Sequence, residues 1–192
     1  VKIEMKITET KLVGVKILKP TRFSDNRGFF AEIYNRRVFE DLGIDVDFVQ
    51  ENHSLSSEVG TVRGLHFQSP PHAQAKLVRC GRGAIFDVVV DIRQDSPTYG
   101  MWIGQELSAE NGTQLFISAG FAHGFVTLEP DSEIIYMCSN YYAPEAEVVL
   151  RWDDPELNIY WPIKGNAILS EKDISAPVLA DLDSKFVWKD KL

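Results

Sequence analysis

The sequence predicts a mainly β protein, and within that class a jelly-roll barrel or sandwich with a few short helices. Short apolar runs broken by glycine, proline, asparagine and aspartate recur along the chain, whereas sustained helical periodicity is scarce. Many short strands are typical of sandwiches and barrels, and a jelly roll leaves a pocket between its sheets. The 192 residues, 44% of them hydrophobic, suffice for one buried core. We therefore expect one domain over residues 1–192, with a core at about 8–176 and a C-terminal arm at about 177–192.

The segment 84–93 alternates most regularly between apolar and polar side chains. One face of this expected strand carries Asp87, Val89, Asp91 and Arg93. The opposite face carries Phe86, Val88, Val90 and Ile92. Because successive side chains of a strand point to opposite faces, we expect the second face to pack in the core and the first to be wet.

The remaining elements follow from similar runs and from turn residues. Further strands are expected around His66 and at 13–18, 29–34, 77–80, 102–107, 114–117, 124–128, 133–141 and 148–152. Tight connections are expected at 81–83 and 110–112, where glycine and asparagine permit turns. Short helices are expected at 37–42, ended by Gly43, and after the segment 170–173.

Charge and cysteine usage limit the classes of partner. A formal net charge of −8 argues against a general nucleic-acid-binding surface, which needs concentrated positive charge. A local basic cluster consists of Arg63, Lys76, Arg79 and Arg82. It would suit the binding of a small anion, and its alternative interpretation is ordinary charge on the solvated face of strands. The distant Cys80 and Cys138 fit free thiols in a reducing cytoplasm better than a disulfide scaffold. No apolar run is long enough to predict a membrane span.

His66 is the most informative candidate for chemistry. It lies in a strand-forming run, with Lys76 ten residues on and Tyr136 in a later expected strand. Histidine titrates near neutral pH, lysine can hold an oxyanion and tyrosine can return a proton, so this set suits proton transfer beside a carbonyl. Each residue also has a structural interpretation. The histidine could be a strand residue whose ring nitrogens are hydrogen-bonded, the lysine could pair with an acidic side chain, and the tyrosine could be a core residue whose hydroxyl is hydrogen-bonded.

The neighbours of His66 add two structural expectations. On an ideal strand His66 shares a face with Gly64 and Gln68, so the missing side chain of Gly64 would leave room for a ligand. Arg63 would then face away, unless a bulge at Gly64 turns it toward the ligand.

The four histidines also require a test for a metal site. Three imidazoles on a β-barrel would be a reasonable transition-metal site. The segment 69–71, Ser-Pro-Pro, separates His66 from His72 and ends the strand between them, which argues against such a site. A metal remains an alternative because His123 could fold back beside His66.

Ordered motifs along nearly the whole chain then closely resemble the dTDP-4-dehydrorhamnose 3,5-epimerase family. They are Ser24–Phe30, Arg63–Gln68, Gln74–Val78, Phe86–Arg93, Ser96–Gly100, Ala122–Phe125, Tyr141–Pro144, Trp152–Pro155 and Leu169–Asp173. The resemblance implies a cupin-type jelly roll, a homodimer, and no metal or other cofactor. It also implies epimerisation at C3 and C5 of a dTDP-4-keto-6-deoxyhexose on the way to dTDP-L-rhamnose.

The resemblance also implies roles for particular residues. His66 would be the general base, Asp173 the carboxylate that orients it, Tyr136 the acid on the opposite face of the sugar, and Lys76 the cation at the enolate oxygen. Arg63 would contact the diphosphate and His123 the sugar. Arg27 and Glu32 would contact the nucleotide across the dimer interface, and other binding positions would be Gln50, Glu51, Asn52, Glu147 and Lys172.

Three alternatives stay open on the sequence. Sibling enzymes that invert only C3 or only C5 of related sugar nucleotides share these motifs. The other two alternatives belong to different functional classes: a metal-dependent cupin and a non-catalytic sugar-binding module.

Overall fold

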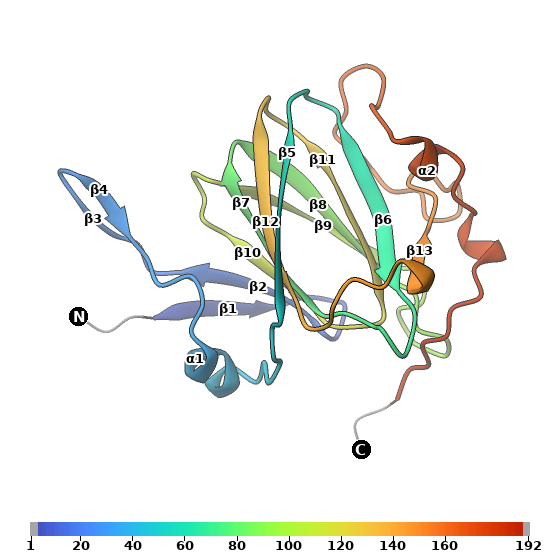
Figure 1. The fold of residues 1–192 in the computed structure, drawn as a ribbon, viewed down its shortest axis with the longest axis horizontal. Helices are drawn as coiled ribbons and strands as arrows, with labels where there is room; N and C mark the ends of the chain where they lie inside the picture. The colour runs from blue at the N-terminus through green and yellow to red at the C-terminus, as the bar shows by residue number, and fades with distance from the viewer. Residues whose placement is uncertain (1–3, 190–192) are drawn as a thin grey trace.

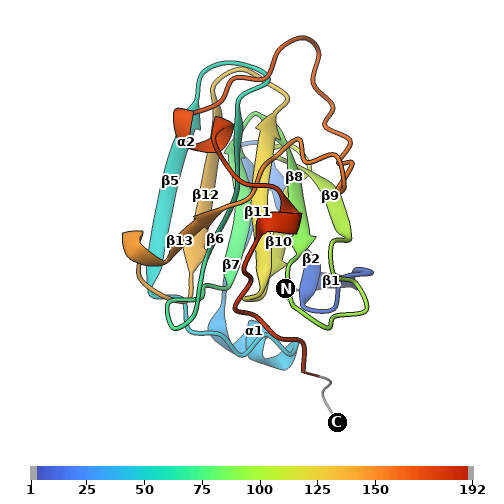
Figure 2. The same ribbon diagram turned by 90° about the vertical axis from the view of Figure 1, so that its right-hand side faces the viewer.

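The computed structural model describes residues 4–189 and consists mainly of antiparallel β-sheet (Figures 1 and 2). One sheet has six strands, in the order β1 (Met5–Glu9), β2 (Val15–Pro20), β10 (Gln114–Ile117), β7 (Lys76–Arg82), β12 (Ser132–Cys138) and β5 (Gln50–Ser56). The other has five, in the order β13 (Glu147–Val149), β6 (Val62–Gln68), β11 (Phe121–Thr127), β8 (Ala84–Asp91) and β9 (Trp102–Ser108). These sheets confirm the predicted mainly β, jelly-roll class.

Short elements surround the two sheets. The hairpin of β3 (Phe23–Asp25) and β4 (Gly28–Phe30) projects from the body of the molecule (Figure 1). The helices are α1 (Arg36–Asp41), α2 (Glu171–Ile174) and the 3₁₀ turns η1 (Pro144–Ala146) and η2 (Leu179–Asp181). Among residues 4–189, no helix is long and apolar enough to cross a membrane.

Three clusters of buried side chains hold these layers together. The first lies between the sheets and includes Val78 of β7, Val89 of β8 and Ile134 of β12. The second lies between the five-stranded sheet and the C-terminal segment, where Val88 and Leu179 are members. The third lies where α1 covers the six-stranded sheet. Burial of this apolar area is the main favourable contribution to folding.

The expected wet face of β8 is buried, so that prediction is wrong. Asp87, Val89 and Asp91 are each 0% exposed, and they belong to the face that we expected to be solvated. The opposite face is also covered, because the C-terminal segment packs on the outside of the sheet: Trp102 Nε1, for example, donates a hydrogen bond to the Leu157 carbonyl at 3.0 Å. Alternation reveals that a strand has two different faces, but not which face a later segment covers.

The element boundaries differ most near the N-terminus. The expected strand at 29–34 shortens to β4, because Asn35 caps α1 and accepts a hydrogen bond from the Arg37 backbone N–H. Helix α1 ends before Gly43, whose φ of +74° is costly for other residues. The edge strands β1 and β5 were not predicted, since their polar residues give little apolar signal.

Candidate active site

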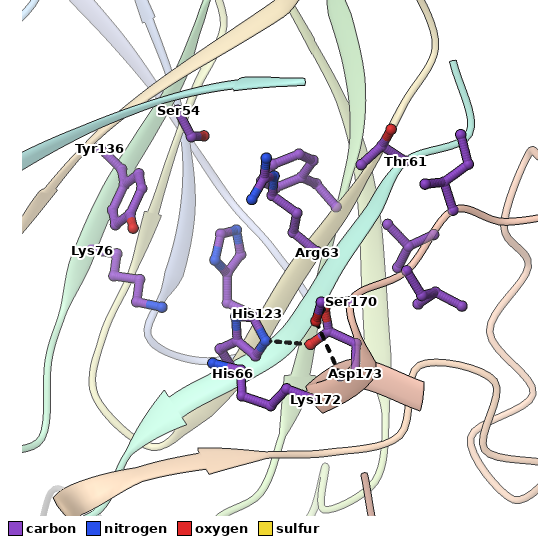
Figure 3. A pocket seen from close by; sticks show the side chains of 14 residues that line it. Ser54, Thr61, Arg63, His66, Lys76, His123, Tyr136, Ser170, Lys172 and Asp173 are labelled. Carbon is purple, nitrogen blue, oxygen red and sulfur yellow. Dashed lines mark hydrogen bonds and ion pairs between the residues drawn. The ribbon is translucent and has the colours of Figure 1, made fainter. Parts of the chain in front are cut away.

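A cavity of about 620 Å³ lies between the two sheets and beside α2 (Figure 3). Its walls carry His66 from β6, His123 from β11, Lys76 from β7 and Tyr136 from β12. A second hollow of about 320 Å³ shares His66, Lys76 and Tyr136 with the first. Since β6 and β11 belong to one sheet and β7 and β12 to the other, the candidate base faces the candidate cation and phenol across the cavity.

His66 is held by a buried carboxylate from α2. Its Nε2 lies 2.6 Å from Oδ1 of Asp173, whose side chain is only 4% exposed. Ser170 caps α2: its hydroxyl donates to Oδ2 of Asp173 at 2.8 Å and accepts from the Asp173 N–H at 3.2 Å. Burial acts to raise the pKa of Asp173, but hydrogen bonds from His66 and Ser170 outweigh it and hold that pKa below its ordinary value.

The protonation state of the imidazole follows from this contact. An ionised carboxylate only accepts hydrogen bonds, so Nε2 of His66 carries a proton. In the neutral ring, Nδ1 then keeps its lone pair and can accept a proton from a ligand.

Lys76 has no bonded carboxylate partner among the described residues. No salt bridge joins it to an acidic side chain within residues 4–189. Burial lowers the pKa of Lys76, whereas the nearby Cys138, Asp87 and Glu147 act to raise it. Its side-chain nitrogen is therefore available for a negatively charged oxygen in the cavity, which would favour its protonated form.

Tyr136 lies on β12, opposite Val78 of β7 and Asn52 of β5 in the strand register. Burial is the main cause that raises the pKa of Tyr136 above its ordinary value. Its phenol therefore stays protonated at neutral pH and can donate a proton or a hydrogen bond. Figure 3 shows Tyr136 and Lys76 next to each other on one side of the cavity.

His123 is the cross-strand partner of His66, but its ring contacts a different carboxylate. Its Nε2 lies 3.0 and 2.9 Å from the two oxygens of Asp87, which is fully buried. Burial is the largest influence on the pKa of Asp87 and raises it, although His123 acts in the opposite direction. Across the part of the chain that the structure describes, no three His, Cys, Asp or Glu side chains converge as metal ligands.

Arg63 reaches the cavity because β6 contains the bulge that this position requires. The register of β6 against β11 shifts between the pairs His66–His123 and Arg63–Phe125. The Arg63 side chain then crosses to β5, where Nε donates to Ser56 Oγ at 3.0 Å and Nη2 to the Leu55 carbonyl at 3.1 Å.

The space beside Gly64 does not serve a ligand, which corrects our expectation. A Cβ atom at Gly64 would lie 2.5 Å from the Gly124 Cα and 2.9 Å from the His123 carbonyl oxygen. The missing side chain therefore lets the neighbouring strand β11 approach closely.

The other predicted binding residues divide into two groups. Lys172 lines the larger cavity, and Gln50, Asn52 and Glu147 line the smaller one, where Lys172 Nζ bonds Glu147 at 2.8 Å. Glu51 instead lines a separate hollow on the other face of β5.

The last two predicted binding residues precede α1: Arg27 lies in the turn of the projecting hairpin, and Glu32 follows β4, where its Oε1 accepts a hydrogen bond from Asn35. Arg27, with a side chain 84% exposed, pairs with Asp25, and neither it nor Glu32 lines either cavity.

Several residues around the cavity were missed by the sequence reasoning. Ser170 could have been found from its position three residues before Asp173, which is a helix N-cap spacing. Asp87 was assigned to a wet face, and Ser54 lies in an edge strand with no apolar pattern.

Solved structures with the same fold identify the class of protein as cupin-like sugar-nucleotide epimerases. A dTDP-6-deoxy-D-glucose-3,5-epimerase from Legionella pneumophila, in complex with dTDP-4-keto-L-rhamnose, superposes with a TM-score of 0.93 at 42% identity, covering 97% of this chain and 100% of that one. A dTDP-4-dehydrorhamnose 3,5-epimerase from Bacillus anthracis, with TDP and PPi bound, gives a TM-score of 0.89 at 48% identity over 91% and 99% of the chains. A 3'-monoepimerase from Streptomyces bikiniensis gives 0.84 at 36% identity over 89% and 86%.

The family model described as dTDP-4-dehydrorhamnose 3,5-epimerase matches residues 9–181. A curated relative of that name from Sinorhizobium fredii is 50% identical over 185 residues, which are 96% of this chain and 95% of the relative. The chain therefore belongs to the dTDP-4-dehydrorhamnose 3,5-epimerase family and is an isomerase. The resemblance drawn from the motifs is confirmed.

Proposed function

We propose that this chain converts dTDP-4-dehydro-6-deoxy-D-glucose to dTDP-4-dehydro-L-rhamnose by inverting C3 and C5, as a step toward dTDP-L-rhamnose. The observation that carries the proposal is the cavity in which the His66–Asp173 pair on one side faces Lys76 and Tyr136 on the other. The match to the family model supports the substrate class.

The chemistry begins with a weakly acidic proton on carbon beside the C4 ketone. Nδ1 of His66 takes this proton, and the electrons of the C–H bond move into an enolate whose oxygen carries the negative charge. Lys76 stabilises this oxygen as the charge develops, more effectively than water would, because the cation is already oriented in a site of low dielectric constant. Asp173 stabilises the imidazolium that results.

Inversion requires that the new proton arrive from the other face of the sugar. Tyr136 donates it to the carbon as the enolate returns to the ketone, and its phenolate regains a proton from solvent. His66 releases the original proton to solvent. The location of these two residues on opposite sheets supports this assignment of base and acid.

The nucleotide part of the substrate needs cations and hydrogen-bonding groups. We assign Arg63 and Lys172 to the diphosphate, because both line the larger cavity and phosphate recognition favours such cations. His123 lines the sugar site. Gln50, Asn52 and Glu147 supply polar groups in the adjoining hollow, whereas the position of Glu51 gives it no contact with a ligand in its own cavity.

Arg27 and Glu32 serve a second copy of the chain in this proposal. Arg27 lies in the hairpin that projects from the body of the molecule (Figure 1), and Glu32 follows that hairpin. Neither residue lines the cavity of its own chain. A homodimer in which each hairpin and the segment after it complete the partner's nucleotide site gives both residues a ligand. Buried free thiols at Cys80 and Cys138 fit a reducing cytoplasm as the place of the reaction.

The test is to incubate the purified protein with dTDP-4-keto-6-deoxyglucose in deuterated water and analyse the product by NMR. Deuterium at both C3 and C5, with both centres inverted, is the expected result. Label and inversion at one carbon only would instead identify a mono-epimerase, the alternative favoured by the similarity to the Streptomyces bikiniensis structure. No deuterium at either carbon would refute epimerisation of this substrate.

A further inference from the structure

Ser54 carries an unexplained polar atom in the wall of the cavity. Among residues 4–189, its Oγ is the one buried side-chain nitrogen or oxygen that has no hydrogen-bond partner. Ser54 lies on β5 and lines the larger cavity. Because a buried hydroxyl without a partner is costly, this atom is expected to acquire its partner from a ligand.

The surroundings of Ser54 favour an anionic partner. The residues that line the cavity include Arg63, Lys76 and Lys172, but Asp173 is their only carboxylate, and it is occupied by His66 and Ser170. An anion in the cavity is therefore attracted by basic side chains, and the one carboxylate that lines the cavity is already hydrogen-bonded to other residues.

Arg63 identifies the part of the anion concerned. Its guanidinium is anchored to Leu55 and Ser56, which follow Ser54 directly on β5, while its Nη1 donates to no residue within 4–189. Figure 3 shows Ser54 at the end of the cavity where Arg63 also lies, away from Asp173. A hydroxyl and a guanidinium with a free N–H at the same end suit a phosphate group.

We propose that Ser54 Oγ donates a hydrogen bond to a phosphate oxygen of the bound nucleotide, beside Arg63. The inference rests on the proposed function, since it takes the diphosphate of a sugar nucleotide as the ligand.

The experiment compares Ser54→Ala with the wild-type protein by calorimetric titration of dTDP and of thymidine. The variant is expected to bind dTDP about tenfold more weakly, the effect of losing one charge-assisted hydrogen bond, and to bind thymidine as the wild type does. The KM for the sugar nucleotide rises by a similar factor, with a smaller effect on kcat. The Tm of the unliganded variant stays equal or rises, because an unsatisfied hydroxyl has been removed.

Ser132→Ala is the matched control. Ser132 is also a buried serine, on β12, but its hydroxyl already has carbonyl partners, since its Oγ lies 2.8 Å from the Glu129 carbonyl oxygen and 3.1 Å from that of Ala84. Its removal is expected to lower Tm and to leave dTDP affinity unchanged, which is the reverse of the result for Ser54→Ala.

Other outcomes overturn the inference in distinguishable ways. Unchanged dTDP affinity in Ser54→Ala means that the hydroxyl holds only water, and an equal loss for thymidine places the contact outside the phosphates. A loss confined to the complete sugar nucleotide assigns the hydroxyl to the sugar. Failure of the wild type to bind dTDP overturns the proposed function and this inference together.

Discussion

His66 Nε2 lies 2.6 Å from Asp173 Oδ1, although 107 residues separate the two in sequence. The carboxylate reaches the strand histidine because α2 begins at the Ser170 cap, beside β6, and Ser170 also holds the second carboxylate oxygen. The contact fixes the ring, and it leaves Nδ1 as the nitrogen that can accept a proton.

Asp173→Asn is expected to lower kcat by about 10²- to 10⁴-fold, because the amide neither fixes the same tautomer nor stabilises the imidazolium. Steady-state kinetics on the sugar nucleotide measures this loss. A kcat within about threefold of the wild type would contradict the role given to the carboxylate.

The same variant changes the pH dependence of stability. The folded-state pKa of Asp173 lies below its ordinary 3.8, so its carboxylate stabilises the fold at pH above that value, and the contribution is lost as pH falls through the folded-state pKa. The difference in Tm between the wild type and Asp173→Asn should therefore shrink in acid below about pH 4. Thermal melts across this range test it, and a growing difference would contradict it.

Tyr136→Phe separates proton removal from proton return. His66 and Lys76 remain, so the variant should still exchange carbon-bound hydrogen with deuterated solvent, while inversion falls by about 10²-fold or more. NMR follows exchange and inversion in one sample. Equal loss of both would argue against a separate acid on the opposite face.

Lys76→Met is expected to raise the thermal stability of the protein and to lower its activity. Burial lowers the pKa of Lys76, so its charge destabilises the fold wherever the folded protein keeps the lysine protonated. Methionine removes this cost, and Tm should rise by a few degrees, on the order of 1 kcal/mol. Activity should fall by about 10²- to 10³-fold, because the enolate oxygen loses its cation.

The sign of the stability effect also predicts its pH dependence. The cost disappears as pH rises from the folded-state pKa of Lys76 toward the ordinary 10.5, so the stability advantage of methionine should shrink in that direction. A variant less stable than the wild type at neutral pH would refute this account of Lys76.

Asp87→Asn tests how the buried carboxylate supports Lys76. Asp87 acts to raise the pKa of Lys76, together with Cys138 and Glu147. Its neutralisation should lower that pKa further, so the alkaline limb of kcat/KM should move to lower pH. Glu147→Gln is the comparison, since Glu147 is the weakest of the three influences and should shift the limb less. An unmoved limb in Asp87→Asn would show that Asp87 acts only on His123.

The sequence predicted the β class and most strands because apolar alternation is a local property. The sequence-based prediction was wrong where burial depends on tertiary contacts. It placed Asp87 in solvent, but this residue lies in the interior and contacts His123. Local reasoning did anticipate the bulge that brings Arg63 to the cavity. It could not locate Asp173, whose partner is far away in the chain, and only the family resemblance named it. Neither local reasoning nor the family resemblance identified Ser54, because a missing hydrogen bond can be recognised only in the folded cavity.

The projecting hairpin makes the dimer testable by mixing two inactive chains. In a mixed dimer of His66→Ala and Arg27→Ala chains, one cavity has both defects. The other combines an intact His66 with the intact Arg27 of the partner's hairpin. Random pairing makes half of the dimers mixed, so about one quarter of all sites should be intact. Coexpressed chains, assayed below the KM of the wild type, should therefore recover about one quarter of its activity per site.

The control mixes His66→Ala with Lys76→Met. Both residues line the cavity of the same chain, so no mixed dimer contains an intact site, and activity should stay at the level of the separate variants. Recovery with Arg27→Ala but not with Lys76→Met is therefore specific to a residue that acts across the interface. If the first mixture shows only the average of its two parent proteins, then Arg27 does not act in the partner's site. The hairpin would then lack the role in nucleotide binding that its position outside its own cavity suggests.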